Sequence, residues 1–421
     1  MKFGMKEFTP KVLETYRRNY VTGKSIYILW ATIILSLLPA AQAQTFTVVT
    51  LFDGGLNGFP QPGMPPLARD AEGNLYGATP TGGGKECFLG TGCGTVYKLD
   101  PTGKVTTLYS FQGPPDGSWP ESVILDSDGN LYGTTLYGGT GQCSNGPTPG
   151  CGTVFKVDQA GHETVLHSFT GAPDGQNPIA ALVRDAKGNL YGTTYLGGKG
   201  SCYGQGCGTV FKISPKGKET VLQYFDDGAD GANPLGSLLL VGSTLYGTTG
   251  AGGTGPCTNS NVVGCGTVFK LEGGTETVLY KFQGPPDGAG PSSNVVRDRE
   301  GNLYGTTSGG GNTTTCPLGP VGCGTVFKLD SVGQETLLYT FNGQTDGFTI
   351  EGLVMDAKGI LYGTAEGPGG AVFEVGAAGQ FSILHSFNDS NQAGSNPGDL
   401  MIDKQGNLYG TTDPAVFKLT P

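Results

Sequence analysis

The sequence predicts an all-β protein, folded as a seven-bladed β-propeller with four-stranded blades. Three observations predict this class: Leu-Tyr-Gly occurs seven times, a phrase that begins Gly-Cys-Gly-Thr-Val occurs five times, and 76 of the 421 residues are glycine. The Leu-Tyr-Gly copies lie 47 to 59 residues apart and begin at Leu75, Leu131, Leu190, Leu245, Leu303, Leu361 and Leu408. A regular spacing of this order is typical of solenoids and propellers.

Each repeat unit contains four strand candidates. In one unit they are Ser122–Asp126, Asn130–Thr135, Gly152–Asp158 and Glu163–Phe169. All four are short runs rich in β-branched or aromatic residues and bounded by Gly, Asp or Pro, as strands are. Four strands in each unit favour a propeller blade, because a solenoid repeat is shorter and less interrupted.

The two ends of the chain predict how the ring closes. The last unit stops after its third strand, Ala415–Pro421, and the segment Thr45–Phe52 reads like the fourth strand of another unit, Glu163–Phe169. We therefore expect one-plus-three closure, in which the N-terminal strand completes the C-terminal blade and removes a free sheet edge.

The order of the strands assigns the loops to two faces. If the strands of a blade are called A to D from the inside outwards, short A–B turns such as Asp126–Asn130 lie on one face. These turns are too short for EF-hand calcium loops, which need twelve residues. The long B–C and D–A loops share the other face, called here the loop face, where variable loops make a binding site most plausible.

The ten cysteines form five local pairs, each bracketing one B–C loop. The pairs are Cys87/Cys93, Cys143/Cys151, Cys202/Cys207, Cys257/Cys265 and Cys316/Cys323. An even number of cysteines in a secreted chain favours disulfides. The alternative is a set of zinc sites, but zinc needs four ligands and no histidine lies in these loops. We expect disulfides and not metal sites at these cysteines, and no cofactor, with calcium elsewhere as the weaker alternative.

Residues 1–43 have the order of a secretory signal peptide. A basic segment precedes the apolar run 26–41, and Ala41-Gln42-Ala43 is a cleavage-site pattern. The alternative is an uncleaved N-terminal anchor. Cleavage would leave one propeller domain, residues 44–421, without a membrane span and in a secreted, extracellular or periplasmic location. The formal net charge of −10 argues against nucleic acid as a partner.

The repeat unit resembles a known bacterial tandem repeat. It reads F-x-G-x-x-D-G-x-x-P, then D-x-x-G-N-L-Y-G-T-T-x-x-G-G, then G-T-V-F-K-L, and it extends over Thr45–Pro421. This pattern is similar to the GloVer (gloeo/verruco) repeat, and its strand pattern is similar to NHL-type propellers. The resemblance implies a repeat scaffold outside the cytoplasm. It implies no defined reaction, so no catalytic residue is inferred from it.

Candidate binding residues lie on the predicted loop face. The D–A loops carry a recurring aspartate, which could bind a cation such as calcium or accept hydrogen bonds from sugar hydroxyls, or could simply form the turn. These are Asp116, Asp174, Asp230, Asp287 and Asp346. Trp119 is the only tryptophan after residue 43 and could stack on a sugar ring or plug its loop. Tyr137, Tyr203 and Phe88 could extend an aromatic surface.

Two classes of function remain. An extracellular binding or scaffold module, monomeric and with a glycan or surface protein as its partner, is the favoured class. A propeller hydrolase or lyase acting on polysaccharide is the alternative, and a central cluster of titratable groups at the channel mouth would favour it. The three histidines, His162, His167 and His385, lie in a turn or in outermost strands, and no nucleophile elbow, zinc-binding helix or P-loop is present.

Overall fold

The computed structural model describes residues 44–421 except 55–57, 59, 61–65, 85–86, 88–89, 145, 147, 260–261, 368–369 and 388–394. The signal peptide predicted at residues 1–43 and the aromatic residue Phe88 lie outside the described residues, and both stay predictions. Thr45–Pro421 forms one compact unit. In the described part of the chain, no helix has the length and hydrophobicity to span a membrane.

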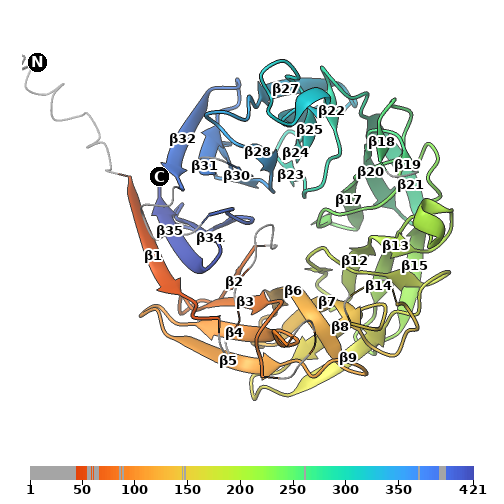
Figure 1. The fold of residues 1–421 in the computed structure, drawn as a ribbon, viewed down its shortest axis with the longest axis vertical. Helices are drawn as coiled ribbons and strands as arrows, with labels where there is room; N and C mark the ends of the chain where they lie inside the picture. The colour runs from red at the N-terminus through yellow and green to blue at the C-terminus, as the bar shows by residue number, and fades with distance from the viewer. Residues whose placement is uncertain are drawn as a thin grey trace, which may run out of the picture. The chain divides into compact units, whose positions relative to one another are not determined.

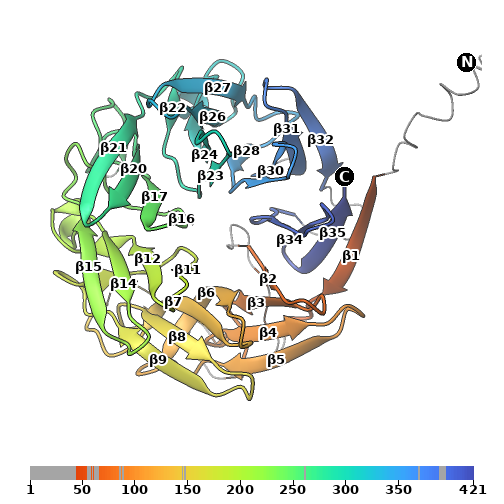
Figure 2. The same ribbon diagram turned by 180° about the vertical axis from the view of Figure 1, so that it is seen from behind.

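Seven small antiparallel sheets are arranged as the blades of a propeller, which confirms the predicted fold class (Figures 1 and 2). In six of the blades the strands follow the chain order A-B-C-D, and the seventh takes its D strand from the N-terminus. Blade 1 consists of β2 (Ala68–Arg69), β3 (Leu75–Thr79), β4 (Thr95–Leu99) and β5 (Val105–Ser110). Blade 2 consists of β6 (Gly117–Leu125), β7 (Leu131–Gly138), β8 (Thr153–Val157) and β9 (Glu163–Ser168).

The middle blades repeat this plan. Blade 3 consists of β11 (Val183–Arg184), β12 (Leu190–Thr194), β14 (Thr209–Ile213) and β15 (Glu219–Tyr224). Blade 4 consists of β16 (Leu239–Val241), β17 (Thr244–Thr249), β20 (Thr267–Glu272) and β21 (Thr275–Lys281). Blade 5 consists of β23 (Val296–Arg297), β24 (Leu303–Thr307), β26 (Thr325–Leu329) and β27 (Glu335–Thr340).

The last two blades and the loops hold the remaining elements. Blade 6 consists of β28 (Phe348–Ile350) and β29 (Val354–Met355), which both pair with β30 (Leu361–Glu366), followed by β31 (Ala371–Val375) and β32 (Phe381–Ser386). Blade 7 consists of β33 (Met401–Ile402), β34 (Leu408–Thr411), β35 (Ala415–Thr420) and β1 (Thr45–Leu51). The loops add β10 (Gly175–Gln176), β13 (Leu196–Gly197), β18 (Thr258–Asn259), β19 (Val262–Val263), β22 (Gly288–Ala289), β25 (Gly309–Gly310), and the 3₁₀ turns η1 (Cys202–Gly204) and η2 (Gly319–Val321).

The predicted one-plus-three closure is confirmed. Strand β1 pairs antiparallel with β35, from Thr45 opposite Thr420 to Leu51 opposite Ala415. Figure 2 shows the red β1 as the outer strand beside the blue β35. Strand β1 therefore covers the edge of β35 that would otherwise be open where the two ends of the ring meet.

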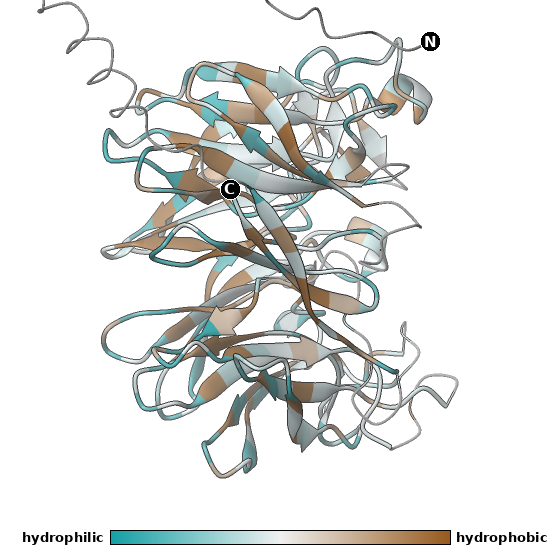
Figure 3. Cartoon of the chain, turned by 90° about the vertical axis from the view of Figure 1, so that its left-hand side faces the viewer, coloured by the Kyte–Doolittle hydropathy of each residue, from teal (hydrophilic) through white to brown (hydrophobic). Residues whose placement is uncertain are grey.

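The blades are joined by a ring of aromatic contacts. The phenylalanine that follows strand D of one blade packs against the aromatic residue of strand C in the next blade, with ring centroids 5.0–5.3 Å apart. The seven pairs are Phe52–Tyr97, Phe111–Phe155, Phe169–Phe211, Phe225–Phe269, Phe282–Phe327, Phe341–Phe373 and Phe387–Phe417. All are buried. Figure 3 shows hydrophobic stretches along the strands and hydrophilic turns between them.

The A–B turns are structural, as predicted. In blade 2, Asp126 Oδ1 accepts a hydrogen bond from the Asn130 backbone N–H at 2.8 Å, and Oδ2 accepts one from the Tyr132 hydroxyl at 3.1 Å. Burial opposes ionisation of Asp126, yet these hydrogen bonds keep its pKa below the ordinary value. In every blade except blade 4, the Tyr of the Leu-Tyr-Gly copy ties strand B to its own turn in this way.

Candidate functional site

Five disulfides brace the loop face, each joining the two cysteines of one B–C loop. All five predicted pairs are confirmed: Cys87–Cys93, Cys143–Cys151, Cys202–Cys207, Cys257–Cys265 and Cys316–Cys323. No described cysteine is free. Because disulfides persist in oxidising compartments, this set points to a secreted, extracellular or periplasmic protein.

The Gly-Cys-Gly phrase holds the loop face against the next blade. A β-carbon at Gly150 would clash with the Gly138 carbonyl, and one at Gly152 would lie 2.5 Å from Pro178 Cδ of blade 3. Between them, the carbonyl of Cys151 accepts the backbone N–H of Asn177, the entry to the next strand A, at 2.9 Å. The same bond joins Trp119 to Cys93, Asn233 to Cys207 and Gly290 to Cys265. Each of these disulfides therefore supports a blade junction as well as its loop.

Four of the five predicted D–A aspartates, all except Asp230, hydrogen-bond within their own loops and to strand D of the same blade. Asp116 Oδ2 accepts from the Tyr109 hydroxyl at 2.9 Å and the Gln112 N–H at 2.8 Å. The Asp287 carboxylate does the same with Tyr280 and Gln283. The structure thus gives this motif a loop-closing role and does not bring the carboxylates together into one site.

The other three predicted aspartates vary this arrangement. Asp346 is buried and accepts from the Tyr339 hydroxyl at 2.8 Å, whereas Asp174 lies 3.3 Å from His167 Nε2. Burial and the neighbouring carboxylate of Asp226 raise the pKa of Asp230 to about 6. His167 therefore replaces a tyrosine as the partner of its loop aspartate.

A row of glutamates at the blade junctions was not singled out from the sequence. Strand D begins with a glutamate in blades 2, 3 and 5 and has one as its second residue in blade 4: Glu163, Glu219, Glu335 and Glu276. In each, Oε1 is buried without a hydrogen-bond partner in the described structure. Burial, with the negative charge of the preceding blade's D–A aspartate, raises the pKa of each side chain, to about 7 for Glu163, Glu276 and Glu335.

These junctions follow a simple pairing rule. The glutamate faces a polar residue in strand D of the preceding blade, such as Gln223, whose amide donates to Glu276 Oε2 at 3.3 Å. In blades 6 and 7 an aromatic residue takes the glutamate's place: Phe381 stacks on Tyr339 at 3.9 Å, and Phe46 stacks on His385 at 3.6 Å. The repeated Glu-Thr at the start of strand D was the signal in the sequence.

Trp119 and Tyr137 form the aromatic part of a candidate binding site on blade 2. Their rings meet edge to face at 6.3 Å, and both side chains are only partly buried. Trp119 has φ 61°, a left-handed conformation that is uncommon for a bulky residue. Glu121 follows on the same strand, and its charge together with burial raises the pKa of Tyr137. We call Trp119, Glu121 and Tyr137 the Trp119 site.

Tyr203 belongs to a separate aromatic pair. It lies in η1 of the blade 3 B–C loop with φ 51°, and its ring centroid is 6.3 Å from that of Tyr195. Their hydroxyl oxygens are 3.4 Å apart. Both side chains are partly buried. The aromatic residues of the loop face thus form one pair on each of two adjacent blades.

A second group of carboxyls, which sequence reasoning missed, lies beside the inner strands of blades 6 and 7. Glu351 and Asp399 are partly exposed, and the Gly352 N–H donates to Asp399 Oδ1 at 2.6 Å. Burial and the charges of Asp399 and Glu366 raise the pKa of Glu351 well above its ordinary value. Burial raises the pKa of Asp399 to about 6. A cavity of about 350 Å³, lined by the inner strands of blades 1 to 5, has Asn294 on its wall.

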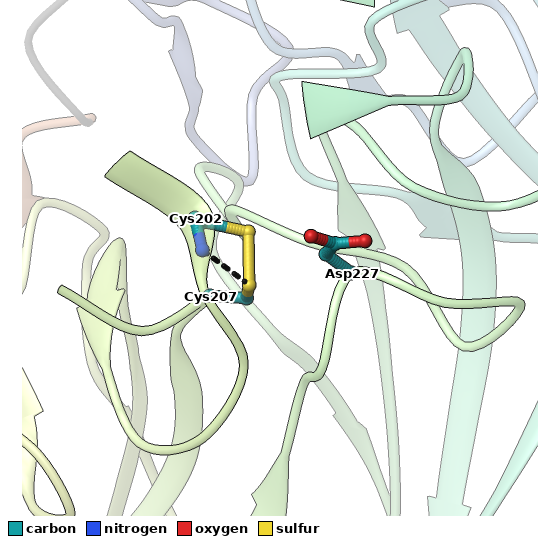
Figure 4. Close-up of side chains that lie close together, drawn as sticks. All are labelled: Cys202, Cys207 and Asp227. Carbon is teal, nitrogen blue, oxygen red and sulfur yellow. Dashed lines mark hydrogen bonds between the residues drawn. A yellow bond between two sulfur atoms is a disulfide. The ribbon is translucent and has the colours of Figure 1, made fainter. Parts of the chain in front are cut away.

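One group of side chains in the described residues has the spacing of metal ligands. Sγ of Cys202, Sγ of Cys207 and a carboxylate oxygen of Asp227 lie within 4.8 Å of one another (Figure 4). The two sulfurs are bonded to each other, however, and the Cys202 N–H donates to Cys207 Sγ at 3.2 Å. A disulfide supplies no thiolate ligand, so this group does not have the chemistry of a metal site.

A family comparison covers almost the whole chain. The Gloeobacter/Verrucomicrobia repeat matches residues 33–259, 141–318 and 254–418. The chain belongs to the Gloeobacter/Verrucomicrobia repeat family. The resemblance inferred from the repeated unit is thereby confirmed. No curated protein matches this sequence.

Solved structures share the propeller fold with this family member at low sequence identity. A streptogramin B lyase is 13% identical with a TM-score of 0.56, over 90% of this chain and 97% of the lyase chain. A proposed 6-phosphogluconolactonase from Bacteroides fragilis is 16% identical with a TM-score of 0.51, over 80% and 88%. The extracellular domain of a proposed hybrid two component system from B. thetaiotaomicron is 13% identical with a TM-score of 0.53, over 90% and 41%.

Proposed function

We propose that this protein is an extracellular binding module that takes up a glycan on its loop face. The observation that carries the proposal is the Trp119–Tyr137 pair, two partly exposed aromatic rings at 6.3 Å with a carboxyl residue beside them. Aromatic rings pack well against the apolar faces of sugars, and neighbouring polar groups bind the hydroxyls. The disulfide-braced junction at Cys93 holds the Trp119 backbone in place, so little ordering is needed on binding.

A glycan array probed with the purified full chain tests this proposal. We expect saturable binding that Trp119→Ala abolishes and Trp119→Phe largely retains, since phenylalanine keeps an aromatic face. Binding that survives Trp119→Ala would place the ligand elsewhere, and no binding to any glycan would leave a surface protein as the better partner. Loss on calcium chelation alone would implicate a cation instead of the aromatic pair.

The second candidate function is a polysaccharide hydrolase or lyase. The Glu351–Asp399 pair supports it, because two neighbouring carboxyls with raised pKa values can supply a general acid and a general base. An assay for new reducing ends or unsaturated products on polysaccharide substrates tests this activity. Turnover by the wild type that Glu351→Gln removes would favour the enzyme, and absence of turnover on substrates that bind would favour the binding module.

A further inference from the structure

Glu121 is a largely buried carboxyl residue without a hydrogen-bond partner among the residues that the structure describes. Its side chain is 8% exposed, and it makes no hydrogen bond or ion pair with any residue that the structure describes. Two neighbours on β6, Ser118 and Ser122, have hydroxyl oxygens that are fully buried and unpartnered. Buried polar groups are normally hydrogen-bonded, so the two serines beside Glu121 need an explanation.

The junction between blades 1 and 2 explains why the Ser122 hydroxyl is left without a partner. At two other junctions the residue before the core Leu of strand A accepts an N–H from the preceding blade: Ser237 Oγ accepts from Ala181 at 3.0 Å, and Asp399 Oδ1 from Gly352 at 2.6 Å. Ser122 holds this position in blade 2. The corresponding residue of blade 1 is Pro66, which has no N–H to donate.

The backbone turns Glu121 out of the strand pairing. The register shifts between Pro120, opposite Thr135, and Ser122, opposite Thr134, so Glu121 is the extra residue of a β-bulge. Bulges re-aim side chains and are frequent beside binding sites. Glu121 is close enough to Tyr137 for its charge to raise the pKa of that hydroxyl, and Tyr137 contacts Trp119.

We propose that Glu121 is a ligand-binding residue of the Trp119 site, where its carboxyl donates a hydrogen bond to an oxygen of a neutral sugar that packs on Trp119 and Tyr137. This inference rests on the proposed function and narrows the ligand to uncharged glycans. A uronate would bring a carboxylate to a chain that already carries a net charge of −10, and that carboxylate would lose hydration beside the buried Glu121.

The charge state of Glu121 agrees with a donor role. Burial raises the pKa of its carboxyl to about 8, so the neutral form, which carries a proton to donate, dominates at pH 7. The strands packed on β6 bring the titratable and charged residues Arg69, Tyr76, Tyr97, Lys98, Tyr132 and Tyr137. Arg69 and Lys98 lie over the rings of Tyr409 and Tyr76, and neither pairs with Glu121.

Tryptophan fluorescence provides the measurement. In the full chain with Trp30→Phe, Trp119 is the only tryptophan, so its emission reports this site alone. The probes are the neutral oligosaccharide that binds most tightly on the array and an oligogalacturonate. We expect the neutral probe to bind, its affinity to fall as pH rises through about 8, and Glu121→Ala to weaken it about tenfold, the loss of one hydrogen bond. The uronate should not bind.

Glu121→Gln and Glu300→Ala are the comparison variants. Glutamine keeps an N–H donor, so Glu121→Gln should retain most of the affinity. It should also lose the pH dependence over a window of roughly pH 6 to 9, around the pKa of Glu121. Glu300 is an exposed A–B turn residue, and its removal should change nothing. If Trp119→Ala abolishes binding but Glu121→Ala does not, the role of Glu121 is refuted while the site stands. If the wild type binds no neutral glycan, the proposed function and this inference both fail.

Discussion

The contacts of single residues explain why the phrase that begins Gly-Cys-Gly-Thr-Val recurs five times. Several residues of Gly-Cys-Gly-Thr-Val-Phe-Lys make contacts of their own. In blade 2, Thr153 Oγ1 lies 2.8 Å from Thr135 Oγ1, Phe155 packs on Phe111, and Lys156 Nζ lies 5.8 Å from the centroid of the Tyr132 ring. Thr153 and Lys156 thus tie strand C to strand B of the same blade, whereas Phe155 contacts the preceding blade, and the phrase recurs because both kinds of contact recur.

Gly152 tests this account of the phrase. Gly152→Ala would place a methyl group 2.5 Å from Pro178 Cδ at a φ of 96°, so we expect the free energy of unfolding to fall by at least about 2 kcal/mol. Gly204→Ala is the matched control, since Gly204 also has positive φ but open space around it, and about 1 kcal/mol is expected there. Equal losses in thermal or urea unfolding would contradict the steric explanation.

The burial of the strand-D glutamates predicts how the stability of the folded blades depends on pH. The folded pKa of Glu163 and Glu335 is raised from 4.5 to about 7, so their contribution to stability is present below pH 4.5 and is lost as pH rises through about 7. Glu163→Gln removes this titration. At pH 8 we expect the variant to have a higher melting temperature than the wild type and a free energy of unfolding that is about 1 kcal/mol larger, after allowance for solvent screening. At pH 4 the two proteins should differ little in stability.

Differential scanning calorimetry over a range of roughly pH 4 to pH 9, which brackets these pKa values, measures the change in stability. Glu300→Gln on an exposed turn is the control and should follow the wild-type curve at every pH. A Glu163→Gln variant that is less stable than the wild type at pH 8 would mean that the ionised carboxylate has a partner, which would contradict the unpartnered Oε1.

The disulfides are elements whose contribution can be removed one at a time. Replacing Cys143 and Cys151 by serine frees a loop closed over a sequence separation of 8 residues. The chain-entropy model gives roughly 2 kcal/mol for a loop of this size. We expect lower stability with the propeller retained, measured by thermal unfolding and far-UV circular dichroism. Collapse of the whole ring after this single change would show that the bridge is required for folding itself.

The sequence predicted the elements better than the candidate site. Strands, blades, closure and disulfide pairs follow from patterns with a fixed period, and these were confirmed. The glutamates Glu121, Glu351 and those of strand D were missed because their burial depends on a neighbouring blade. Pro66 illustrates the limit: its missing N–H matters only because blade 1 lies next to Ser122, and no local pattern shows that.

The whole molecule depends on the closure of the ring. Deleting Thr45–Phe52 would remove β1, its pairing with β35, and the Phe52–Tyr97 contact between blades 7 and 1. We expect a lower melting temperature and a tendency to aggregate through the exposed edge of β35, seen in thermal scans and size-exclusion chromatography. An unchanged melting temperature and solubility would show that closure contributes little to stability.

The proposed binding function concerns the whole molecule, because its candidate residues lie on one face of the ring. The loops of that face carry or adjoin the disulfides, the Trp119 site and the Tyr195–Tyr203 pair. In the short A–B turns on the opposite face, the polar side chains hydrogen-bond within the turn, as Asp126 does. The Glu351–Asp399 pair beside the inner strands provides the competing location.

A crystal structure of the full chain with the strongest neutral oligosaccharide from the array is the most direct test. The account predicts a sugar ring packed on Trp119 and Tyr137, with an oxygen within hydrogen-bond distance of Glu121. A sugar, or a cleaved product, bound at Glu351 and Asp399 with Trp119 uncovered would contradict it.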